Sequence, residues 1–569
     1  MWITARRRVN VCFAFFFCCA TQVHAASITP GEQDFIRDRQ DRLMQEQQGR
    51  LEDLKKLPGE HISPSAPAAP TDARCFAIQR IDIQGADTLS PAQKASLVLP
   101  YLGQCLGVTQ LNELLKIITD RYLQLGLVTS RAYLPQQDLS TGILVLQVVE
   151  GRLEGLHPAG ESGLTPRELN MAFPGQVGEL LNLREVEQLV DQLNRLPSNH
   201  AQIELAPGEV LGGSNVLVRN TTQKPWRASL SRNNGGQRST GQQQWSAGID
   251  WDSPLGLADQ LVLRGSHDAV SDHHRSSKSS TVYYSVPWGW WNFNYSYSQS
   301  EYGSRAHGNG FAFKQNGDSQ NHQLRAERVI HRDSISKTSV NGGLAYLRSN
   351  NHLNGNRLEV SSNRISEAQF GINHGRRIGN AFVNLDLGMQ QGIGAFDAQS
   401  RKIEQHSDPN DRYRKYTATL SYLQGFNLWG ETFSFTSLAN GQRSEDVLFS
   451  PQRMSLSGQS SMRGTRDQNL SGDSGGYWRN DLRWTRPVNL AWLRPAFDEY
   501  GIGLGYDQGV IRSDRYNGDQ HGRVSSNSVE LFARGQHFAT SVTFAHSLER
   551  PDALSERETP IYFRLDLLL

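Results

Sequence analysis

Long apolar runs are missing from this chain of 569 residues once its first 25 residues are set aside. No later segment holds the run of about 18 or more apolar residues that a membrane-spanning helix requires. The mean hydropathy of the chain is −0.53. A bundle of membrane helices is therefore excluded. Two classes remain: a soluble exported protein, or a barrel that crosses a membrane with strands.

The chain also lacks a surplus of charge of one sign. Its 58 basic and 57 acidic residues give a formal net charge of +1, which argues against a nucleic-acid partner. No P-loop motif GxxxxGK[ST] occurs. His267, His273 and His274 lie close together in a predicted exterior loop, but they lack the i, i+4 helical spacing of a zinc site. We therefore expect a protein that is not an enzyme and that needs no metal or cofactor.

The first 25 residues have the features of an export signal. A basic segment over 6–8 precedes an apolar run over 11–20, and Val23-His24-Ala25 offers a cleavage site. Three of the five cysteines are lost with this signal peptide (1–25), so the mature chain keeps Cys75 and Cys105. An even pair in an oxidising compartment favours a disulfide, and two free thiols are the alternative.

Residues 26–57 are predicted to form one long polar helix. The segment GEQDFIRDRQDRLMQEQQGRLEDLKKL is rich in helix formers, and its thin apolar stripe consists of Phe35, Ile36, Leu43, Leu51 and Leu54. Such a helix buries little on its own, so it is either a solvated spacer or the occupant of a water-filled interior. Residues 58–74 contain several prolines and are expected to form a semi-extended linker.

Residues 75–225 predict two small α+β units in tandem. In the first unit, 75–150, apolar residues recur at helical spacing in TQLNELLKIITDRYLQLG, and strands are expected over 76–83, 128–134 and 143–149. In the second unit, 151–225, helices are expected over 166–173 and 183–194, with strands on either side of PGEVLGGS. The repeated β-α-α-β-β order is typical of a binding module, and no catalytic constellation accompanies it.

Residues 226–569 alternate polar and apolar side chains. The segments QWSAGIDWD and WNFNYSYS place aromatic residues on one face at period two, which is typical of membrane β-barrel strands. Tight connections such as DSPLGLADQ alternate with longer polar segments, SHDAVSDHHRSSKSS and SEYGSRAHGNGFAFKQNGDSQNH, which we expect to be exterior loops. At about 10 residues per strand and roughly 20 to 22 per strand plus its connection, this length predicts about 16 strands. The final PIYFRLDLLL is expected to close the barrel against its first strand.

Taken together, these segments resemble the TpsB outer-membrane transporters of two-partner secretion. CFAIQRIDIQGADTL and ITDRYLQLGLVTSRAYLPQQDLSTGILVLQVVEGRLEGL are similar to the first POTRA domain of that family, cysteines included. PGQVGELLNLREVEQLVDQLNRLPS and APGEVLGGSNVLV are similar to the second, and DSPLGLADQL, YYSVPWG and VIHRDSISKTSV to early barrel segments. The resemblance implies a mainly β fold with a plug helix (26–57), two periplasmic POTRA domains (75–150 and 151–225) and a transmembrane barrel (226–569).

The resemblance also implies that loop 6 of the barrel, around 451–476, folds back into the interior. Its tip in the family carries V/L-R-G-Y/F, and the matching residues here are Met462-Arg463-Gly464-Thr465, with threonine in place of the aromatic residue. The arginine is implied to pair with a wall aspartate, for which GLGYDQGVI supplies Asp507 and Asp498 is the weaker candidate. The alternative is an exposed loop arginine that contributes less than about 1 kcal/mol.

In this resemblance the chain is an outer-membrane pore that recognises a large unfolded exported partner through its POTRA domains and secretes it without ATP. The partner would be a haemolysin, an adhesin or a contact-dependent inhibition toxin. Outer-membrane lipid surrounds the barrel, and the barrel-assembly machinery and periplasmic chaperones are implied during biogenesis. The main alternative is an assembly factor that inserts other barrels, a group that usually has more POTRA domains and no plug helix.

Overall fold

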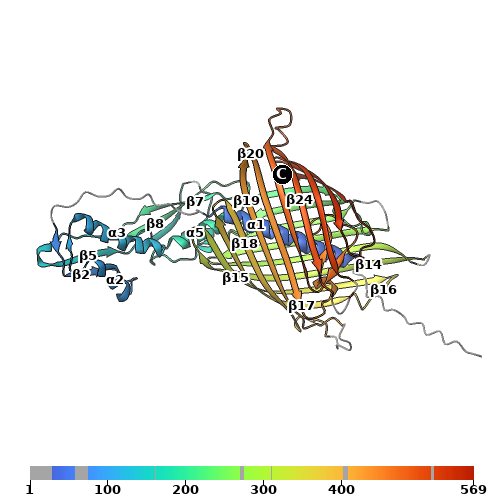
Figure 1. The fold of residues 1–569 in the computed structure, drawn as a ribbon, viewed down its shortest axis with the longest axis horizontal. Coiled ribbons are helices and arrows are strands. Elements are labelled where there is room, and N and C mark those ends of the chain that lie inside the picture. The colour runs from blue at the N-terminus through green and yellow to red at the C-terminus, as the bar shows by residue number, and fades with distance from the viewer. Residues whose placement is uncertain are drawn as a thin grey trace, which may run out of the picture.

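The computed structural model describes residues 29–57, 75–160, 162–269, 274–308, 311–400, 408–513, 518 and 520–569. Figure 1 shows two small α+β domains at one end of a large β-barrel, with helix α1 (Pro30–Lys55) running through the barrel interior, which we call the lumen. The predicted signal peptide, 1–25, and the linker, 58–74, lie outside the described residues. Within the described residues, no helix combines the length and the apolar composition needed to cross a bilayer.

The first α+β domain has a three-stranded sheet in the order β2-β5-β4, with β2 and β5 parallel. Its core includes the buried face of α3, whereas Leu125, the last apolar residue in the segment that predicted this helix, follows the end of α3 and is 37% exposed. The strand predicted over 76–83 is divided in two, since its first part pairs with β3 and its second with β5. The elements are β1 (Phe76–Ala77), β2 (Arg80–Gln84), α2 (Pro91–Val98), η1 (Leu99–Tyr101), β3 (Cys105–Leu106), α3 (Val108–Gln124), β4 (Arg131–Tyr133), η2 (Leu139–Thr141) and β5 (Ile143–Val149).

A disulfide joins Cys75 to Cys105, as the sequence predicts. Pairing of β1 with β3 holds the two Cα atoms 5.3 Å apart. Non-reducing mass spectrometry of the mature protein should therefore show one cross-linked Cys75–Cys105 peptide, and two alkylatable thiols would contradict the bond. Because the bond closes a separation of 30 residues, replacing both cysteines with serine should lower the free energy of unfolding of this domain by about 3–4 kcal/mol in urea.

The second α+β domain repeats the design with a sheet in the order β6-β8-β7, in which β6 and β8 are parallel. Val186, Leu189 and Leu193 lie on one face of α5 and are buried in the core, as the helical spacing predicts. The elements are β6 (Arg152–Pro158), α4 (Pro166–Ala172), α5 (Leu183–Asn194), β7 (Ala201–Pro207) and β8 (Gly213–Asn220).

The barrel is a closed ring of sixteen strands within the described residues, in agreement with the prediction. Neighbouring strands are antiparallel, and the last strand, β27, returns to the first, β9, to close the ring. A two-residue strand, β16 (Asn356–Arg357), only extends the hairpin at the tip of β15. The ring consists of β9 (Trp226–Asn233), β10 (Gln244–Asp252), β11 (Gln260–Asp268), β12 (Ser276–Trp288), β13 (Trp291–Gly308), β14 (Phe311–Arg332), β15 (Ser336–Leu353), β17 (Asn363–Ile378), β18 (Ala381–Ile393), β19 (Arg414–Leu428), β20 (Glu431–Ser444), β23 (Gly475–Pro487), β24 (Glu499–Ile511), β25 (Gly522–Arg534), β26 (Phe538–Glu549) and β27 (Ile561–Leu568).

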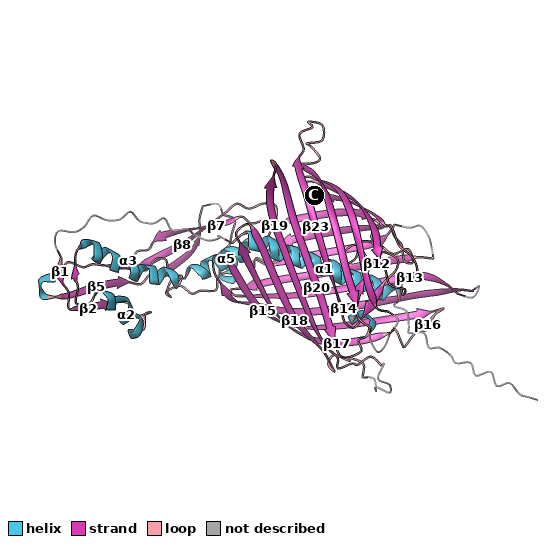
Figure 2. Ribbon diagram, viewed as in Figure 1, coloured by secondary structure: helices cyan, strands magenta, loops and turns pink. Residues whose placement is uncertain are grey.

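Apolar and polar side chains alternate along the barrel strands, and this alternation gives the wall an apolar outer face. On β10, Trp245, Ile249 and Trp251 are nearly half exposed, whereas Gly248 and Asp252 between and beside them are buried. Figure 2 shows how the strands enclose α1. The outward aromatic and aliphatic residues suit a lipid environment, and the inward polar residues suit a wet lumen.

Two segments predicted to be exterior loops are largely strand instead. Eight of the 15 residues 266–280 belong to β11 and β12, and 21 of the 23 residues 300–322 belong to β13 and β14. Strands β13, β14 and β15 have 18, 22 and 18 residues, far more than the roughly 10 that span a bilayer. The polar composition was misleading because backbone ladders continue wherever neighbouring strands pair, even where no lipid requires an apolar face.

Helix α1 begins with a capping box. The Thr29 hydroxyl accepts from the Glu32 backbone N–H, the Glu32 carboxylate accepts from the Thr29 N–H, and Pro30 stands in the first turn. The predicted apolar stripe is buried at Phe35, Ile36, Leu51 and Leu54, and Leu43 is half-buried. Phe35 packs in a cluster with Leu347, Ile365, Tyr413, Leu448 and Phe449. The helix therefore packs inside the barrel and is not a free spacer.

Candidate functional site

The tip of loop 6 (451–476) places a buried arginine against the barrel wall. Nε of Arg463 donates to Oδ2 of Asp507 on β24 at 2.8 Å, and Nη2 donates to Oδ1 of the same carboxylate. The backbone N–H of Arg463 reaches Oδ2 at 3.1 Å. The side chains of Arg463 and Asp507 are 7% and 1% exposed. Separating such a pair would leave a buried charge without a partner, which typically costs about 3–5 kcal/mol.

A second carboxylate and a second arginine complete this cluster. Nη1 of Arg463 donates to Asp481 on β23, and Nε of Arg479, on the same strand, lies 3.7 Å from Oδ1 of Asp507. Arg479 also donates to the Gln459 carbonyl in loop 6 at 2.7 Å. Sequence reasoning missed both residues. The signal was the period-two spacing of Arg479 and Asp481 directly after the loop, which aims both side chains into the lumen.

Gly464 stands where no side chain fits. A Cβ atom at this position would lie 2.4 Å from Cβ of Ser526 and 3.1 Å from Cα of Ser547. The close approach lets the Gly464 N–H donate to the Ser526 hydroxyl at 3.1 Å. On the other side of the tip, the Tyr562 hydroxyl on β27 donates to the Arg463 carbonyl at 3.0 Å. The loop tip is thus bound to four wall strands, β23, β24, β25 and β27.

Two further residues that the sequence singled out, Thr465 and Asp498, have different places in the structure. Thr465, which replaces the aromatic residue of the family pattern, is buried, and its hydroxyl donates to the Met462 carbonyl at 3.2 Å to close the turn. Asp498 lies in the connection before β24, where its backbone pairs with Val488 and Arg534. The structure therefore brings Arg463 to Asp507 and not to Asp498.

Residues 472–476 read GDSGG, a match to the G-x-S-x-G pattern, although no such elbow was expected from the sequence. In hydrolases this pattern turns from a strand into a helix and exposes the serine beside a histidine. Here Ser474 leads into strand β23, and its hydroxyl donates to the Ser444 carbonyl at 3.0 Å. The match is therefore part of loop 6 and not a nucleophile elbow.

Loop 6 also has an interior of its own. It forms the turn η3 (Ser450–Gln452) and a small hairpin of β21 (Met454–Leu456) and β22 (Leu470–Gly472). Nε of Arg453 donates to Asp473 at 3.0 Å, and both side chains are at most 5% exposed. Apolar loop residues pack against the wall in one cluster with Leu438, Tyr477, Ile511, Val524 and Leu554. The loop is folded and anchored along its length.

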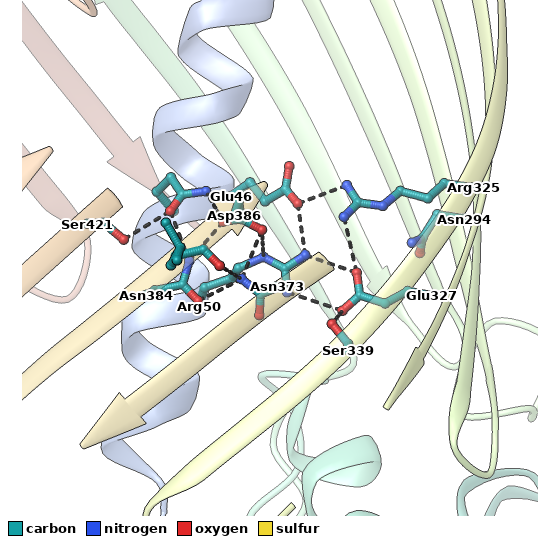
Figure 3. A network of polar contacts seen from close by, with 12 residues as sticks. Glu46, Arg50, Asn294, Arg325, Glu327, Ser339, Asn373, Asn384, Asp386 and Ser421 are labelled. Carbon is teal, nitrogen blue, oxygen red and sulfur yellow. Dashed lines mark hydrogen bonds and ion pairs between the residues drawn. The ribbon is translucent and has the colours of Figure 1, made fainter. Parts of the chain in front are cut away.

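Helix α1 is held to the barrel wall by a polar network around Arg50 (Figure 3). Arg50 donates to both carboxylate oxygens of Glu327 on β14, at 3.1 and 2.9 Å. Its Nε lies 3.7 Å from Oδ1 of Asp386 on β18. Glu46, one turn earlier on the helix, accepts from Arg50 and from Arg325 of β14. The helix is thus fixed by charges from two separate parts of the wall.

One turn away, Gln47 extends the same network. Its amide donates to Asp386 at 2.7 Å, and its carbonyl accepts from Asn384 at 3.1 Å and from Ser421 at 2.9 Å. The residue is 4% exposed although it is polar. A buried glutamine with both ends satisfied specifies the position of the helix more than it adds stability.

The other half of α1 contacts loop 6 directly. Arg39 donates to the carbonyls of Pro451 and Arg453, at 2.8 and 3.2 Å, and Gln40 donates to the Ser455 carbonyl at 2.7 Å. The helix and the loop therefore form one lumenal unit, and a displacement of either breaks contacts of the other.

The second α+β domain is docked on the short connections at its end of the barrel. Asp191 of α5 accepts from Arg332 at the end of β14 and, at 3.2 Å, from Lys337 at the start of β15. Burial raises the pKa of Asp191, but Lys337 and Arg332 outweigh burial and hold the pKa of this carboxyl below its usual range. The ion pair is thus complete above the ordinary aspartate pKa of about 3.9 and is lost as the pH falls through the lowered value. The α1 end is close by, since Lys56 donates to the Asn194 carbonyl at 3.3 Å.

In the described part of the chain, no group of three or more His, Cys, Asp or Glu side chains is arranged to hold a metal ion. Of the clustered histidines, His273 lies outside the described residues.

A polar helix and a folded-back loop inside a sixteen-strand barrel, with two α+β domains at one mouth, define an outer-membrane transporter barrel that carries POTRA domains. Residues 76–151 match the ShlB-type POTRA domain and residues 152–207 a POTRA domain. Residues 212–533 match the haemolysin secretion/activation protein ShlB/FhaC/HecB, and the chain belongs to this family.

Curated relatives and a solved structure agree with this assignment. The chain is 32% identical over 544 residues to the outer membrane transporter CdiB of Escherichia coli O6:K15:H31 (strain 536 / UPEC). That match covers 95% of this chain and 91% of that protein. It is 33% identical over 505 residues to the hemolysin transporter protein ShlB of Serratia marcescens. That match covers 88% of this chain and 87% of ShlB. The structure of CdiB from Escherichia coli matches with a TM-score of 0.89 at 31% identity, over 96% of this chain and 100% of that one.

These matches confirm the predicted family, the two POTRA domains and the outer-membrane location, with the POTRA domains on the periplasmic side. The relatives are transporters rather than enzymes. From here on, the first and second α+β domains are called the first and second POTRA domains.

Proposed function

We propose that this chain secretes a large unfolded partner protein through its barrel, and that α1 and loop 6 close the pore between passages. The observation that carries this proposal is the polar lumenal unit. Beside its buried apolar stripe, α1 has charged and amide contacts to the wall that water or another polar chain can replace. By analogy with the relatives, the partner is a haemolysin or a contact-dependent inhibition toxin, and an adhesin is also compatible.

The POTRA domains offer the partner exposed sheet edges. In the first domain, the edge strand β4 and the residue after it carry Tyr133 and Leu134, which are 50% and 40% exposed. In the second, Leu205 on the edge strand β7 is 38% exposed. An extended segment that pairs with an edge gains main-chain hydrogen bonds, and apolar side chains beside the edge add selectivity.

Transport through this barrel proceeds without ATP in our proposal. The sequence has no P-loop, so folding of the partner outside the cell, which prevents backward sliding, supplies the direction. The apolar outer face of the barrel requires insertion into outer-membrane lipid, and we assign that step to the barrel-assembly machinery with periplasmic chaperones.

The proposal is tested with the reading frame beside this gene, where we expect a very large exported protein with an N-terminal secretion domain. Co-expression of that protein with this chain should place it in the culture medium, and expression without the chain should leave it in the periplasm. Export that is equally efficient without the chain would contradict the proposed function. A general loss of outer-membrane barrels in cells without the chain would favour the assembly-factor alternative.

A further inference from the structure

Glu327, the main partner of Arg50, is held in place by residues of the wall itself. Its Oε1 accepts from the Ser339 hydroxyl at 2.8 Å, and its Oε2 accepts from Nη2 of Arg325 at 3.2 Å (Figure 3). Ser339 and Arg325 belong to β15 and β14, so neither moves with the helix. The carboxylate therefore keeps its position and orientation when α1 leaves.

Asp386 is prearranged in the same way. Its Oδ1 accepts from Asn373 and its Oδ2 from Asn384, both at 2.8 Å, and these amides come from β17 and β18. Its ion pair among the described residues is with Arg50. Amides orient a carboxylate but do not neutralise it. Removal of α1 thus leaves a fixed carboxylate in the lumen without a cation.

The arrangement fits a guanidinium better than an ammonium. The two terminal nitrogens of Arg50 bond the two oxygens of Glu327, and its Nε lies 3.7 Å from Oδ1 of Asp386, so one planar guanidinium contacts carboxylates from β14 and β18. A lysine ammonium is a compact point charge that lacks this fork. The pair of carboxylates therefore discriminates by shape as well as by charge.

The position of this pair suits a transported chain. Glu327 precedes Arg332 by five residues on β14, and Arg332 contacts Asp191 of the second POTRA domain. A polypeptide that arrives from that domain therefore reaches Glu327 in the periplasmic half of the lumen, before it reaches loop 6.

We propose that Glu327 and Asp386 form a guanidinium-binding site, which Arg50 occupies in the closed state and arginine side chains of the partner occupy during passage. This inference rests on the proposed function and specifies its chemistry: the partner displaces the plug by replacing Arg50. Arginine is thus the residue of the partner that competes with α1, and lysine is a poor substitute.

The test uses the chain without residues 31–57, in which the site is vacant, in planar bilayers. Argininamide added on the POTRA side should block the current at lower concentration than lysinamide. Replacing Glu327→Gln together with Asp386→Asn should raise the argininamide concentration for half-block by about ten-fold or more, as expected for losing charge-assisted hydrogen bonds. The lysinamide concentration for half-block should change less in this double variant than the argininamide concentration does.

Glu530→Gln is the matched control. Glu530 lies on β25, an even number of residues from Ser526, which contacts the loop tip, and it accepts from its own wall arginine, Arg483, at 2.8 Å. In this variant, the argininamide concentration for half-block should equal that of the chain without residues 31–57. Equal block by the two amides, or an unchanged argininamide block in the Glu327/Asp386 double variant, would overturn the guanidinium site and leave the plug role intact. A deletion that does not raise conductance would overturn the plug role and this inference together.

Discussion

Replacing Arg463 with alanine should abolish secretion of the partner while the barrel still assembles. The substitution removes the three side-chain hydrogen bonds of Arg463 to Asp507 and Asp481. Asp507, which is 1% exposed, then keeps two neutral donors and, as a cation, the more distant Arg479. Uncompensated burial of that charge costs about 3–5 kcal/mol, enough to release the loop tip. Secretion is measured as partner protein in the medium, and assembly as heat-dependent migration of the barrel on gels.

Arg463→Lys should restore little secretion, because an ammonium cannot hold both carboxylates as the fork does. Arg443→Ala is the matched control, since Arg443 pairs with Glu445 at 3.3 Å and both side chains are at least 70% exposed. Its loss should change secretion very little. Normal secretion by Arg463→Ala would show that the buried pair has no role in transport.

Deleting residues 31–57 should raise the single-channel conductance in planar bilayers, because the deletion removes the helix that fills the lumen. Arg50→Ala should give a partial effect, in which the helix remains but is docked more weakly. Loss of its charge-assisted bonds to Glu327 and Glu46 should cost about 1.5–3 kcal/mol, which raises the fraction of time in the open state by about ten-fold or more.

Lys55→Ala provides the control for Arg50→Ala. Lys55 is a cation of the same helix, but its side chain is exposed and pairs at 2.7 Å with Glu52 of the helix itself rather than with the wall. Its removal should leave the conductance unchanged. If the chain without residues 31–57 conducts no more than the complete chain, α1 is not the plug.

Local patterns predicted the elements that are amphipathic by themselves. The helices α3 and α5, the strand β5 and the final strand β27 follow directly from apolar spacing, and the disulfide follows from the count of cysteines that remain after export. The long polar strands β13 and β14 could not be predicted from apolar spacing, because polar strands are recognisable only through the neighbours with which they pair.

The contacts inside the lumen were also only partly predictable from the sequence. The motif at Arg463 and Asp507 was located through a family resemblance, but the contributions of Asp481 and Arg479 depend on the register of β23 against β24. The contacts of Arg50 join residues 277 and 336 positions apart in the chain, to Glu327 and Asp386. No spacing in the sequence encodes such a meeting, since the closed ring of strands creates it.

The last residues of α1 determine where the helix goes when it is displaced. Leu57 lies at the POTRA end of the lumen, where its carbonyl accepts from Arg377 at 2.9 Å, and the 17 residues 58–74 connect it to Cys75. A chain of this length reaches at most about 60 Å, so the released helix stays covalently tethered to the first POTRA domain. Its rebinding is a first-order event at an effective concentration in the millimolar range. The pore should therefore reseal by itself after each cargo molecule, at a rate independent of how many transporters the membrane holds.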